Sequence, residues 1–175
     1  MTNRYLAPRL LSTDDRVEGF ECGSVEQTQW LRRHARQANA TGTAKVLVVT
    51  EPADQNVVAY YAWSMAQITV DDAPVRLRKG AGRYPQPIAL LARLGVAIDH
   101  ERYELGAGLL RDVITRTAAL GTEFGCRGLL VHAESDEAFA FYRHLIPDFE
   151  SSPTDGLHLV LLMKDIHRTI TNGTG

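Results

Sequence analysis

The stretch that decides the fold runs from Ile88 to Arg116. It begins with the apolar run Ile88-Ala-Leu-Leu-Ala-Arg-Leu-Gly-Val-Ala-Ile98 and, after a polar link, continues as Leu105-Gly-Ala-Gly-Leu-Leu-Arg-Asp-Val-Ile-Thr-Arg116. The first part predicts a buried strand, and the second predicts an amphipathic helix that starts at small residues. The N–H groups and the dipole of a helix N-terminus attract anions. We therefore expect a phosphate-bearing ligand at this turn.

Further elements follow from the same kind of pattern on both sides of this stretch. Ser24 and Ser135 are placed as N-caps of two helices, and the turn-like segment 51–56 separates two Val-rich runs, which predicts a β-hairpin. The segment 74–87 is rich in Gly, Pro and cations, and we expect a mobile loop without a regular element. The other predicted elements are a first strand over 5–11, a helix over 25–38, hairpin strands over 45–50 and 57–64, and later strands over 128–133 and 157–163.

Composition limits the class of protein. A chain of 175 residues with 45% hydrophobic content is long enough for one sizeable core, so we expect a single α/β domain over residues 1–175, with a frayed polar tail from about residue 168. The net charge of −2 argues against binding of nucleic acid by the overall field of the protein. Cys22 and Cys126 lack the spacing of a zinc site or a disulfide framework. The absence of a signal segment and of a long apolar span predicts a cytoplasmic protein without a membrane partner.

Four blocks of sequence carry a resemblance to a known family. The chain resembles the GNAT superfamily of acyl-CoA-dependent N-acetyltransferases and, within it, the toxins of toxin–antitoxin modules that acetylate aminoacyl-tRNA. The blocks are Gly19-Phe-Glu-Cys-Gly23 before Trp30-Leu-Arg-Arg-His34; Asp72-Ala-Pro-Val-Arg-Leu-Arg78; Pro87-Ile88 with Leu91-Ala-Arg-Leu94; and Leu130-Val-His-Ala133 followed by Ala140-Phe-Tyr142 and Ser152-Pro-Thr-Asp155.

The resemblance implies a GNAT fold, in which helices flank a central, mixed and splayed β-sheet. It also implies acetyl-CoA as co-substrate, with the pantetheine arm along the strand and the pyrophosphate at the helix start. The cofactor-binding residues are then Leu94, Val96, Ala97, Leu105, Gly106, Ala107, Gly108 and Leu109. For a lone Gly-x-Gly, close helix–sheet packing is an equally good explanation, and the other matches favour cofactor binding.

For the chemical step, the resemblance points to Tyr142 as the general acid that protonates the departing thiolate. The alternative is that Phe139, Tyr142 and Leu145, spaced at helical intervals, only form core. The α-amine of an aminoacyl ester has a pKa at or below the roughly 7.7 to 8.0 of a free α-amine, so much of it is neutral at physiological pH and no strong base is required. A backbone N–H at Val96 or Ala97 is the candidate donor to the tetrahedral oxyanion.

A group of cations is the candidate RNA-binding surface. We expect these side chains to guide the acceptor end of the tRNA, whereas the alternative is ordinary solvated charge. The residues are Arg76, Arg78, Lys79, Arg83 and Arg93, with Arg32 and Arg33 as further candidates and Tyr84 as a stacking surface. The six histidines show no metal-ligand spacing, and we interpret His132 as a hydrogen-bonded core residue.

Two positions depart from the family pattern. Glu101 and Glu104 fall where the pyrophosphate-binding motif has other residues, and Glu104 stands at a glycine position. A carboxylate there predicts weaker acetyl-CoA binding, and glutamate does not adopt the positive φ of glycine freely. Two further readings therefore stay open: an acetyltransferase of a small-molecule or protein amine, and a non-catalytic member that binds an antitoxin. The resemblance further implies a homodimer and a cognate DNA-binding antitoxin that keeps the protein inactive.

Overall fold

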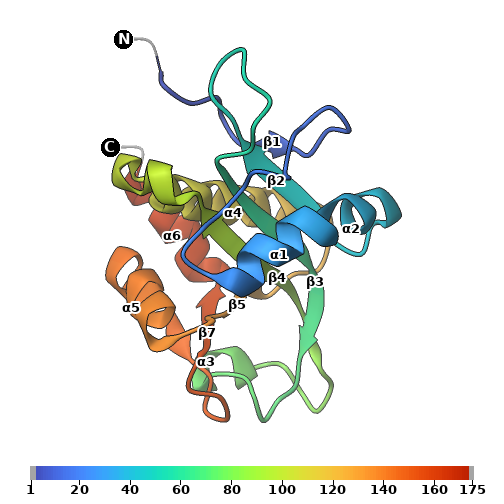
Figure 1. Cartoon of the computed structure of the whole chain (residues 1–175). Helices are drawn as coiled ribbons and strands as arrows, with labels where there is room; N and C mark the ends of the chain where they lie inside the picture. Colours follow the sequence, from blue (N-terminus) through green and yellow to red (C-terminus); the bar gives the residue numbers. More distant parts are fainter. Residues whose placement is uncertain (1–2, 174–175) are drawn as a thin grey trace. The chain divides into compact units, whose positions relative to one another are not determined.

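The computed structural model describes residues 3–173 (Figure 1). Its strands pair in the order β1-β2-β3-β4-β5-β7-β6, with β4 and β5 parallel and the pairs β1–β2, β2–β3, β5–β7 and β6–β7 antiparallel. The strands are β1 (Arg9–Leu10), β2 (Lys45–Val49), β3 (Ala59–Ile68), β4 (Gln86–Val96), β5 (Gly128–His132), β6 (Glu150–Ser151) and β7 (His158–Leu162). The predicted mixed sheet with helices is thereby confirmed.

The helices are α1 (Val25–Arg33), α2 (Ala35–Thr41), α3 (Val75–Arg78), α4 (Leu105–Glu123), α5 (Asp136–Leu145) and α6 (Met163–Gly173), with the 3-10 helix η1 (Ile98–Tyr103) before α4. No helix within the described residues is long and apolar enough to cross a membrane. The chain forms two compact units. The first unit consists of Met1–Ser64 and Ala92–Asp112, and the second of Met65–Leu91 and Val113–Gly175.

An aromatic cluster forms the core of the first unit. Tyr60 on β3 is fully buried, stacks on Trp30 of α1 with ring centroids 6.1 Å apart, and meets the ring of Phe20 edge-on. Its hydroxyl donates to the carbonyl oxygen of Gln27 at 2.7 Å. Because this hydrogen bond satisfies the buried hydroxyl, the tyrosine joins α1 to the sheet without leaving a polar group unpaired.

The first helix begins where the sequence predicts, but it is interrupted. The Ser24 side chain accepts a hydrogen bond from the Gln27 N–H at 3.1 Å, which is the N-cap interaction. At His34 the backbone leaves helical geometry, with φ −121° and ψ −21°, and α2 starts at Ala35. The prediction of one helix over 25–38 was therefore wrong. Nothing in the residue pattern marks this break, because no Gly or Pro stands near it.

Strand β5 is central to the second unit, where it pairs with β4 on one side and β7 on the other. Its first residue, Gly128, lies so close to the neighbouring strand that a Cβ atom would collide with the backbone oxygen of Leu161. Glycine is therefore required for this close approach. Helix α5 begins at the predicted cap, because the Ser135 side chain accepts from the Ala138 N–H at 3.1 Å.

Two predictions in the second unit were wrong. Residues 169–173, expected as part of a fraying tail, belong to helix α6, whose Ile166 is fully buried; residues 174–175 lie outside the described part of the chain. The segment 74–87 contains helix α3, whose Leu77 is also fully buried. In both segments a short helix is held by one apolar side chain that is buried in the core. This packing stabilises the helix although most of the residues around that side chain are polar.

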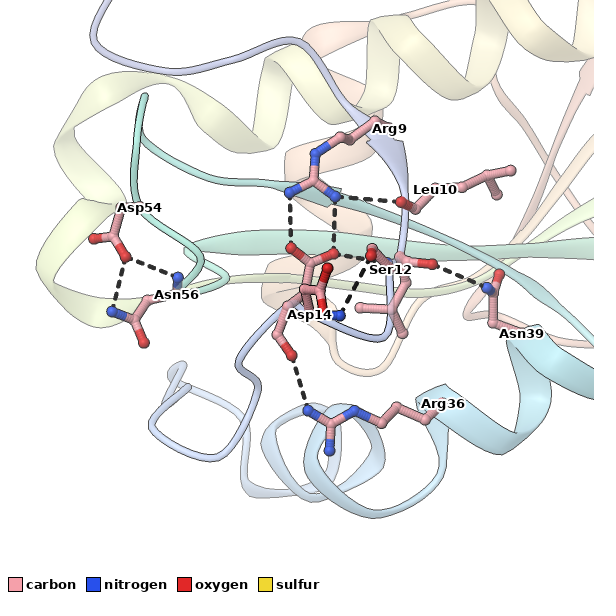
Figure 2. A network of polar contacts seen from close by, with 10 residues as sticks. Arg9, Leu10, Ser12, Asp14, Arg36, Asn39, Asp54 and Asn56 are labelled. Atoms are coloured by element: carbon pink, nitrogen blue, oxygen red, sulfur yellow. Dashed lines mark hydrogen bonds and ion pairs between the residues drawn. The ribbon is translucent and has the colours of Figure 1, made fainter.

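A buried carboxylate ties the N-terminal segment of the first unit together (Figure 2). Asp15 is 2% exposed and accepts two hydrogen bonds from Arg9, at 2.7 and 2.8 Å, and one from the Ser12 N–H at 2.7 Å. Arg36 of α2 donates to the Asp15 carbonyl oxygen at 2.8 Å. Burial by itself raises the pKa of the Asp15 carboxyl, but the hydrogen bonds from Arg9 and Ser12 outweigh it and hold this pKa below its ordinary value.

Because the pKa of Asp15 is lower in the folded state, the ionised carboxylate stabilises the fold. This stabilisation is complete when the pH lies above the pKa of Asp15 in the unfolded chain, and it is lost as the pH falls through the pKa in the folded state. Asp15→Asn is expected to lower the free energy of unfolding by about 1–3 kcal/mol at pH 7. The difference from wild type should begin to shrink below about pH 4, where the Asp15 carboxyl of the unfolded chain protonates, and should vanish below the lowered pKa of the folded state. Urea unfolding at pH 7 and pH 3 measures it.

Asp14→Asn is the matched control, because Asp14 is the exposed neighbour and its carboxylate accepts no hydrogen bond from any residue within 3–173. This variant should unfold like wild type at both pH values. A difference between Asp15→Asn and wild type that is the same at pH 7 and pH 3 would show that the ion pair does not cause the acid sensitivity.

Candidate functional site

The second half of β4 carries the first group of candidate residues. Its parallel pairing with β5 covers Ala89–Leu91, so residues 92–96 extend beyond this paired stretch. Gly95 faces the aromatic core, since a Cβ atom there would lie 3.1 Å from Tyr60 Cε1 and 3.4 Å from Cys22 Sγ. Because side chains alternate along a strand, Leu94 and Val96 face the opposite side, where both are half-buried.

Hydrogen bonding of the next residue fixes the direction of the backbone N–H groups. The Ala97 N–H donates to the Val58 carbonyl oxygen at 2.8 Å, and the Ile98 N–H donates to the Glu21 carbonyl oxygen at 3.0 Å. The Ala97 N–H is thus not available for an oxyanion, which corrects half of that prediction. Since successive N–H groups of a strand point to opposite edges, those of Val96 and Leu94 point away from Val58 and remain the candidate donors.

Helix α4 supplies the second group of candidates, Leu105–Leu109. Glu104, just before it, adopts φ 58° and ψ 27°, the left-handed conformation typical of glycine. Its carbonyl oxygen accepts from the Gly108 N–H at 3.1 Å, so the N–H groups of residues 105–107 have no intrahelical acceptor. A Cβ atom at Gly108 would meet nothing within 4 Å, so the first turn of α4 borders open space.

The geometry of this turn fits a phosphate. Three free N–H groups, the positive end of a 19-residue helix and the absence of a side chain at Gly108 allow close approach of an anion. The helix is fixed from behind, because Leu109 and Leu110 are buried and the Tyr61 hydroxyl donates to the Asp112 carboxylate at 2.6 Å. Glu104 keeps the backbone path that glycine would take, and its exposed carboxylate adds a negative charge beside the site.

Tyr142 lies on α5 of the second unit and is 6% exposed, packed edge-on against Phe141 and Phe149. Burial, with a smaller contribution from the Glu134 carboxylate, raises the pKa of its hydroxyl well above the ordinary value. The phenol is therefore neutral across the physiological range and is a proton donor rather than a base. The same burial agrees with a core role, so the surroundings alone do not choose between the two predictions.

His132 was predicted as a core histidine, and this was wrong. It is the last residue of β5, its side chain is exposed, and it stacks on His158 with ring centroids 3.8 Å apart and an interplanar angle of 11°. Partial burial of its ring and the neighbouring His158 lower the pKa of His132, so the His132 imidazole is neutral at physiological pH. Among residues 3–173, no three His, Cys, Asp or Glu side chains are grouped to hold a metal ion.

Ion pairing separates the predicted basic cluster into fixed and free side chains. Arg76 pairs with Asp165 at 2.7 Å and with Glu150 at 2.9 Å, while Arg78 Nε donates to the Ala73 carbonyl oxygen at 2.8 Å. Lys79 and Arg83 are exposed and take part in no ion pair with another described residue.

The remaining predicted cations belong to the first unit. Arg93 pairs with Glu26 at 2.8 Å and lies over the Trp30 ring, and Arg32 donates to the Phe20 carbonyl oxygen at 2.7 Å. Both side chains thus hold α1 in place. Arg33 is exposed. Tyr84, the predicted stacking residue, lies in the second unit and is also exposed.

Two cations of this surface were missed by sequence reasoning. Arg127 and Lys164 line a pocket together with Arg76 and Lys79. Each stands alone in the sequence, between Cys126 and Gly128 and after Met163, so no run of charge marks it. Only the pairing of β5 with β7 brings Arg127 next to the start of α6, where the Met163 N–H donates to the Arg127 carbonyl oxygen at 2.9 Å.

Comparison with known proteins identifies the family. The chain is 41% identical over 166 residues to a tRNA-acetylating toxin of Mycobacterium tuberculosis, which covers 95% of this chain and 97% of the relative. This chain belongs to the tRNA-acetylating toxin family. It is also 25% identical over 129 residues to a probable toxin TacT of Sinorhizobium fredii, which covers 73% of this chain and 71% of that relative. A search against protein-family models finds no match.

Solved structures of family toxins share the fold. A mutant of KacT superposes with a TM-score of 0.88 at 18% identity, covering 95% of this chain and 99% of KacT. AtaT in complex with acetyl-methionyl-tRNAfMet superposes with a TM-score of 0.85 at 18% identity, covering 94% of this chain and 98% of AtaT. The predicted GNAT fold is confirmed by these superpositions.

The left-handed residues give a stability test. Glu104→Gly relieves about 1–2 kcal/mol of left-handed strain in the folded state. Glycine also gives the unfolded chain more conformational freedom, which costs the folded state about 0.5–1 kcal/mol. The free energy of unfolding should therefore rise by about 0.5–1 kcal/mol. Ala53→Gly is the matched control, because Ala53 is exposed and has φ 60° in the β2–β3 link. Both variants should gain similar stability in urea unfolding. A loss of stability in Glu104→Gly alone would mean that the carboxylate is itself stabilising.

Proposed function

We propose that this chain transfers the acetyl group of acetyl-CoA to the α-amino group of aminoacyl-tRNA and so blocks translation. The observation that carries the proposal is the 41% identity to a tRNA-acetylating toxin over 95% of the chain. An acetylated α-amine has lost the nucleophilic lone pair that forms the peptide bond. The reaction takes place in the cytoplasm, where charged tRNA is found.

The first unit carries the residues for acetyl-CoA. AtaTR, a structural neighbour, has been crystallised with acetyl-CoA, and the end of β4 and the start of α4 support the same ligand for this chain. Leu94 and Val96 at the end of β4, with Ala97 just after it, form the segment along which the pantetheine arm extends, and the Leu94 N–H donates to an amide carbonyl oxygen of the arm. The first turn of α4, from Leu105 to Leu109, receives the pyrophosphate. The ligand supplies an activated thioester.

The second unit carries the proton donor. When the neutral α-amine attacks the thioester carbonyl, negative charge develops on the carbonyl oxygen and then on the leaving sulfur. The Val96 N–H stabilises the oxygen, and Tyr142 gives its proton to the sulfur, which leaves as a thiol when the C–S bond breaks. The attacking nitrogen loses a proton to water as the amide forms, and the Tyr142 hydroxyl regains its proton from water. The raised pKa of the Tyr142 hydroxyl keeps that proton in place throughout the pH range in which the amine loses its own.

The partners follow from the same relatives. AtaT has been solved bound to the C-terminus of the antitoxin AtaR, and KacT with its antitoxin on DNA. This chain is proposed to form a homodimer and to be neutralised by a cognate DNA-binding antitoxin.

The function is tested by transfer of label from radiolabelled acetyl-CoA to charged tRNA, with deacylated tRNA as the negative control. Wild-type protein should label only the charged form, and the rate should rise up to about pH 8 as the amine deprotonates and then stay level. Tyr142→Phe should lower kcat by about 100-fold or more without weakening acetyl-CoA binding. Tyr84→Phe, which changes an exposed tyrosine, should leave kcat unchanged.

No label on charged tRNA from folded protein would overturn the proposal. If calorimetry then shows that acetyl-CoA still binds, the acceptor is another amine. If it does not bind, the chain is a non-catalytic partner. Unchanged kcat in Tyr142→Phe would remove the tyrosine from the mechanism and leave it as a core residue.

Glu104 gives a separate prediction for cofactor affinity. A carboxylate about 7 Å from a phosphate charge, at an effective dielectric constant near 20, lowers affinity by about 30-fold. Glu104→Gln and Glu104→Gly should therefore both bind acetyl-CoA more tightly, and calorimetric titration measures the change. Glu123→Gln, at the far end of the same helix, is the matched control and should bind like wild type. Equal affinities in all four proteins would show that the carboxylate turns away from the phosphates.

A further inference from the structure

We propose that Lys79, Arg127 and Lys164 form a pocket that holds a backbone phosphate of the charged tRNA. The inference rests on the proposed function and assigns a binding site for its substrate. The pocket lies in the second unit, has a volume of about 430 Å³, and is lined by Arg76, Lys79, Arg127, Leu162, Met163 and Lys164. Four of these six side chains are cationic, and no acidic side chain is among them.

Ion pairing neutralises only part of this charge. The two carboxylates next to the pocket are Asp165 and Glu150, and they are matched by Arg76 and Arg168, which lies 3.6 Å from Asp165. Lys79, Arg127 and Lys164 have no carboxylate partner among residues 3–173. Three uncompensated positive charges therefore meet in one concavity, and a phosphate is the anion that neutralises them best in this chain's reaction.

Arg127 is fixed in position before any ligand arrives. Its Nη1 donates to Gln86 Oε1 at 2.8 Å and its Nη2 donates to the Leu77 carbonyl oxygen at 3.1 Å. Both acceptors are neutral, so they orient the guanidinium without cancelling its charge. A held guanidinium loses little conformational entropy on binding, and its planar donors suit phosphate oxygens. Lys79 and Lys164 are exposed and add mobile charges on either side.

The distribution of lysines supports a specific site. The chain has three lysines, Lys45, Lys79 and Lys164, and two of them line this one pocket although they lie 85 residues apart in sequence. By contrast, a second pocket of about 340 Å³, which contains Arg83, also contains the acidic Asp71. The carboxylate opposes an anion there, so the first pocket is the better phosphate site.

The lining favours RNA over an acidic protein segment. A protein partner normally gains affinity from large apolar anchors that fill pockets, whereas four of the six residues that line this pocket are cationic and only Leu162 and Met163 are apolar. Protein–nucleic acid contacts instead go largely to phosphate oxygens from Arg and Lys side chains. Phosphates of acetyl-CoA are the other source of the same chemistry, and the experiment distinguishes them.

Lysine footprinting tests the site directly. The protein is labelled briefly with a water-soluble N-hydroxysuccinimide ester, alone and with charged tRNA, acetyl-CoA or cognate antitoxin, and each lysine is quantified by mass spectrometry. Saturating charged tRNA should slow labelling of Lys79 and Lys164 by about fivefold or more, because the bound phosphate covers both amines. Lys45, exposed on β2, is the internal control and should label at the same rate. Acetyl-CoA alone should protect neither pocket lysine.

Variants give the second measurement. The double variant Lys79→Gln/Lys164→Gln should bind charged tRNA about tenfold more weakly, and the slope of log affinity against log salt should fall by about 1, because one phosphate contact is lost. Acetyl transfer to an aminoacylated nucleoside, which has no RNA backbone to reach the pocket, should keep its rate. Lys45→Gln, the matched control, should bind tRNA like wild type with an unchanged salt slope.

The outcomes of these experiments distinguish failure of the phosphate pocket from failure of the proposed function. If the wild-type protein acetylates charged tRNA and neither pocket lysine is protected, the pocket does not bind the substrate although the proposed function stands. Protection by acetyl-CoA alone would assign the pocket to the cofactor, and protection only by the antitoxin would assign it to that protein. Protection by tRNA in a protein that acetylates no tRNA would support the pocket and overturn the proposed catalysis instead.

Discussion

Glu104 holds the backbone in a left-handed turn, and the candidate cofactor residues of the first unit depend on this turn. It ends η1 and starts α4, since its carbonyl oxygen accepts the first helical hydrogen bond from Gly108. The turn places three unpaired N–H groups of α4 only a few residues after the end of β4. The hydrogen bond from Tyr61 to Asp112 then fixes the helix to β3. These contacts specify the conformation, so the chain tolerates a glutamate where glycine is less strained.

Ion pairing decides which cations are left for a ligand. Arg76 and Arg93 look equivalent to Lys79 in the sequence, yet each has a carboxylate within 3 Å and supports the packing of helices. The carboxylate of Asp165 is fully buried, so removing Arg76 would leave it only the longer contact with Arg168 at 3.6 Å. The free cations are those whose neighbours are neutral, such as Arg127 with Gln86. An arginine that forms an ion pair in the folded state has a structural role, whereas the cations without a carboxylate partner are those proposed to bind the phosphate.

Much of this architecture follows from local sequence signals, and the exceptions have physical causes. Ser24 and Ser135 mark helix starts because capping is a contact within three residues. The break at His34 and the short helix α3 have no such signal, since packing of distant side chains imposes them. The residues proposed for acetyl-CoA all lie within the stretch 94–109, so one sequence pattern is enough to predict them together. The pocket of Lys79, Arg127 and Lys164 draws on three distant segments, and only the fold brings them together.

The negative net charge of the chain opposes an RNA substrate, and screening by salt removes most of this opposition. With a charge of −2, the protein repels a polyanion at long range in pure water. At physiological ionic strength the screening length is about 8 Å, so charges beyond that distance contribute little to an exposed contact. A pocket with three uncompensated cations therefore outweighs a small negative total, because only its own charges lie within reach of a bound phosphate. Binding of this kind is local and strongly salt-dependent, and the neutral Tyr142 adds no charge that would oppose it.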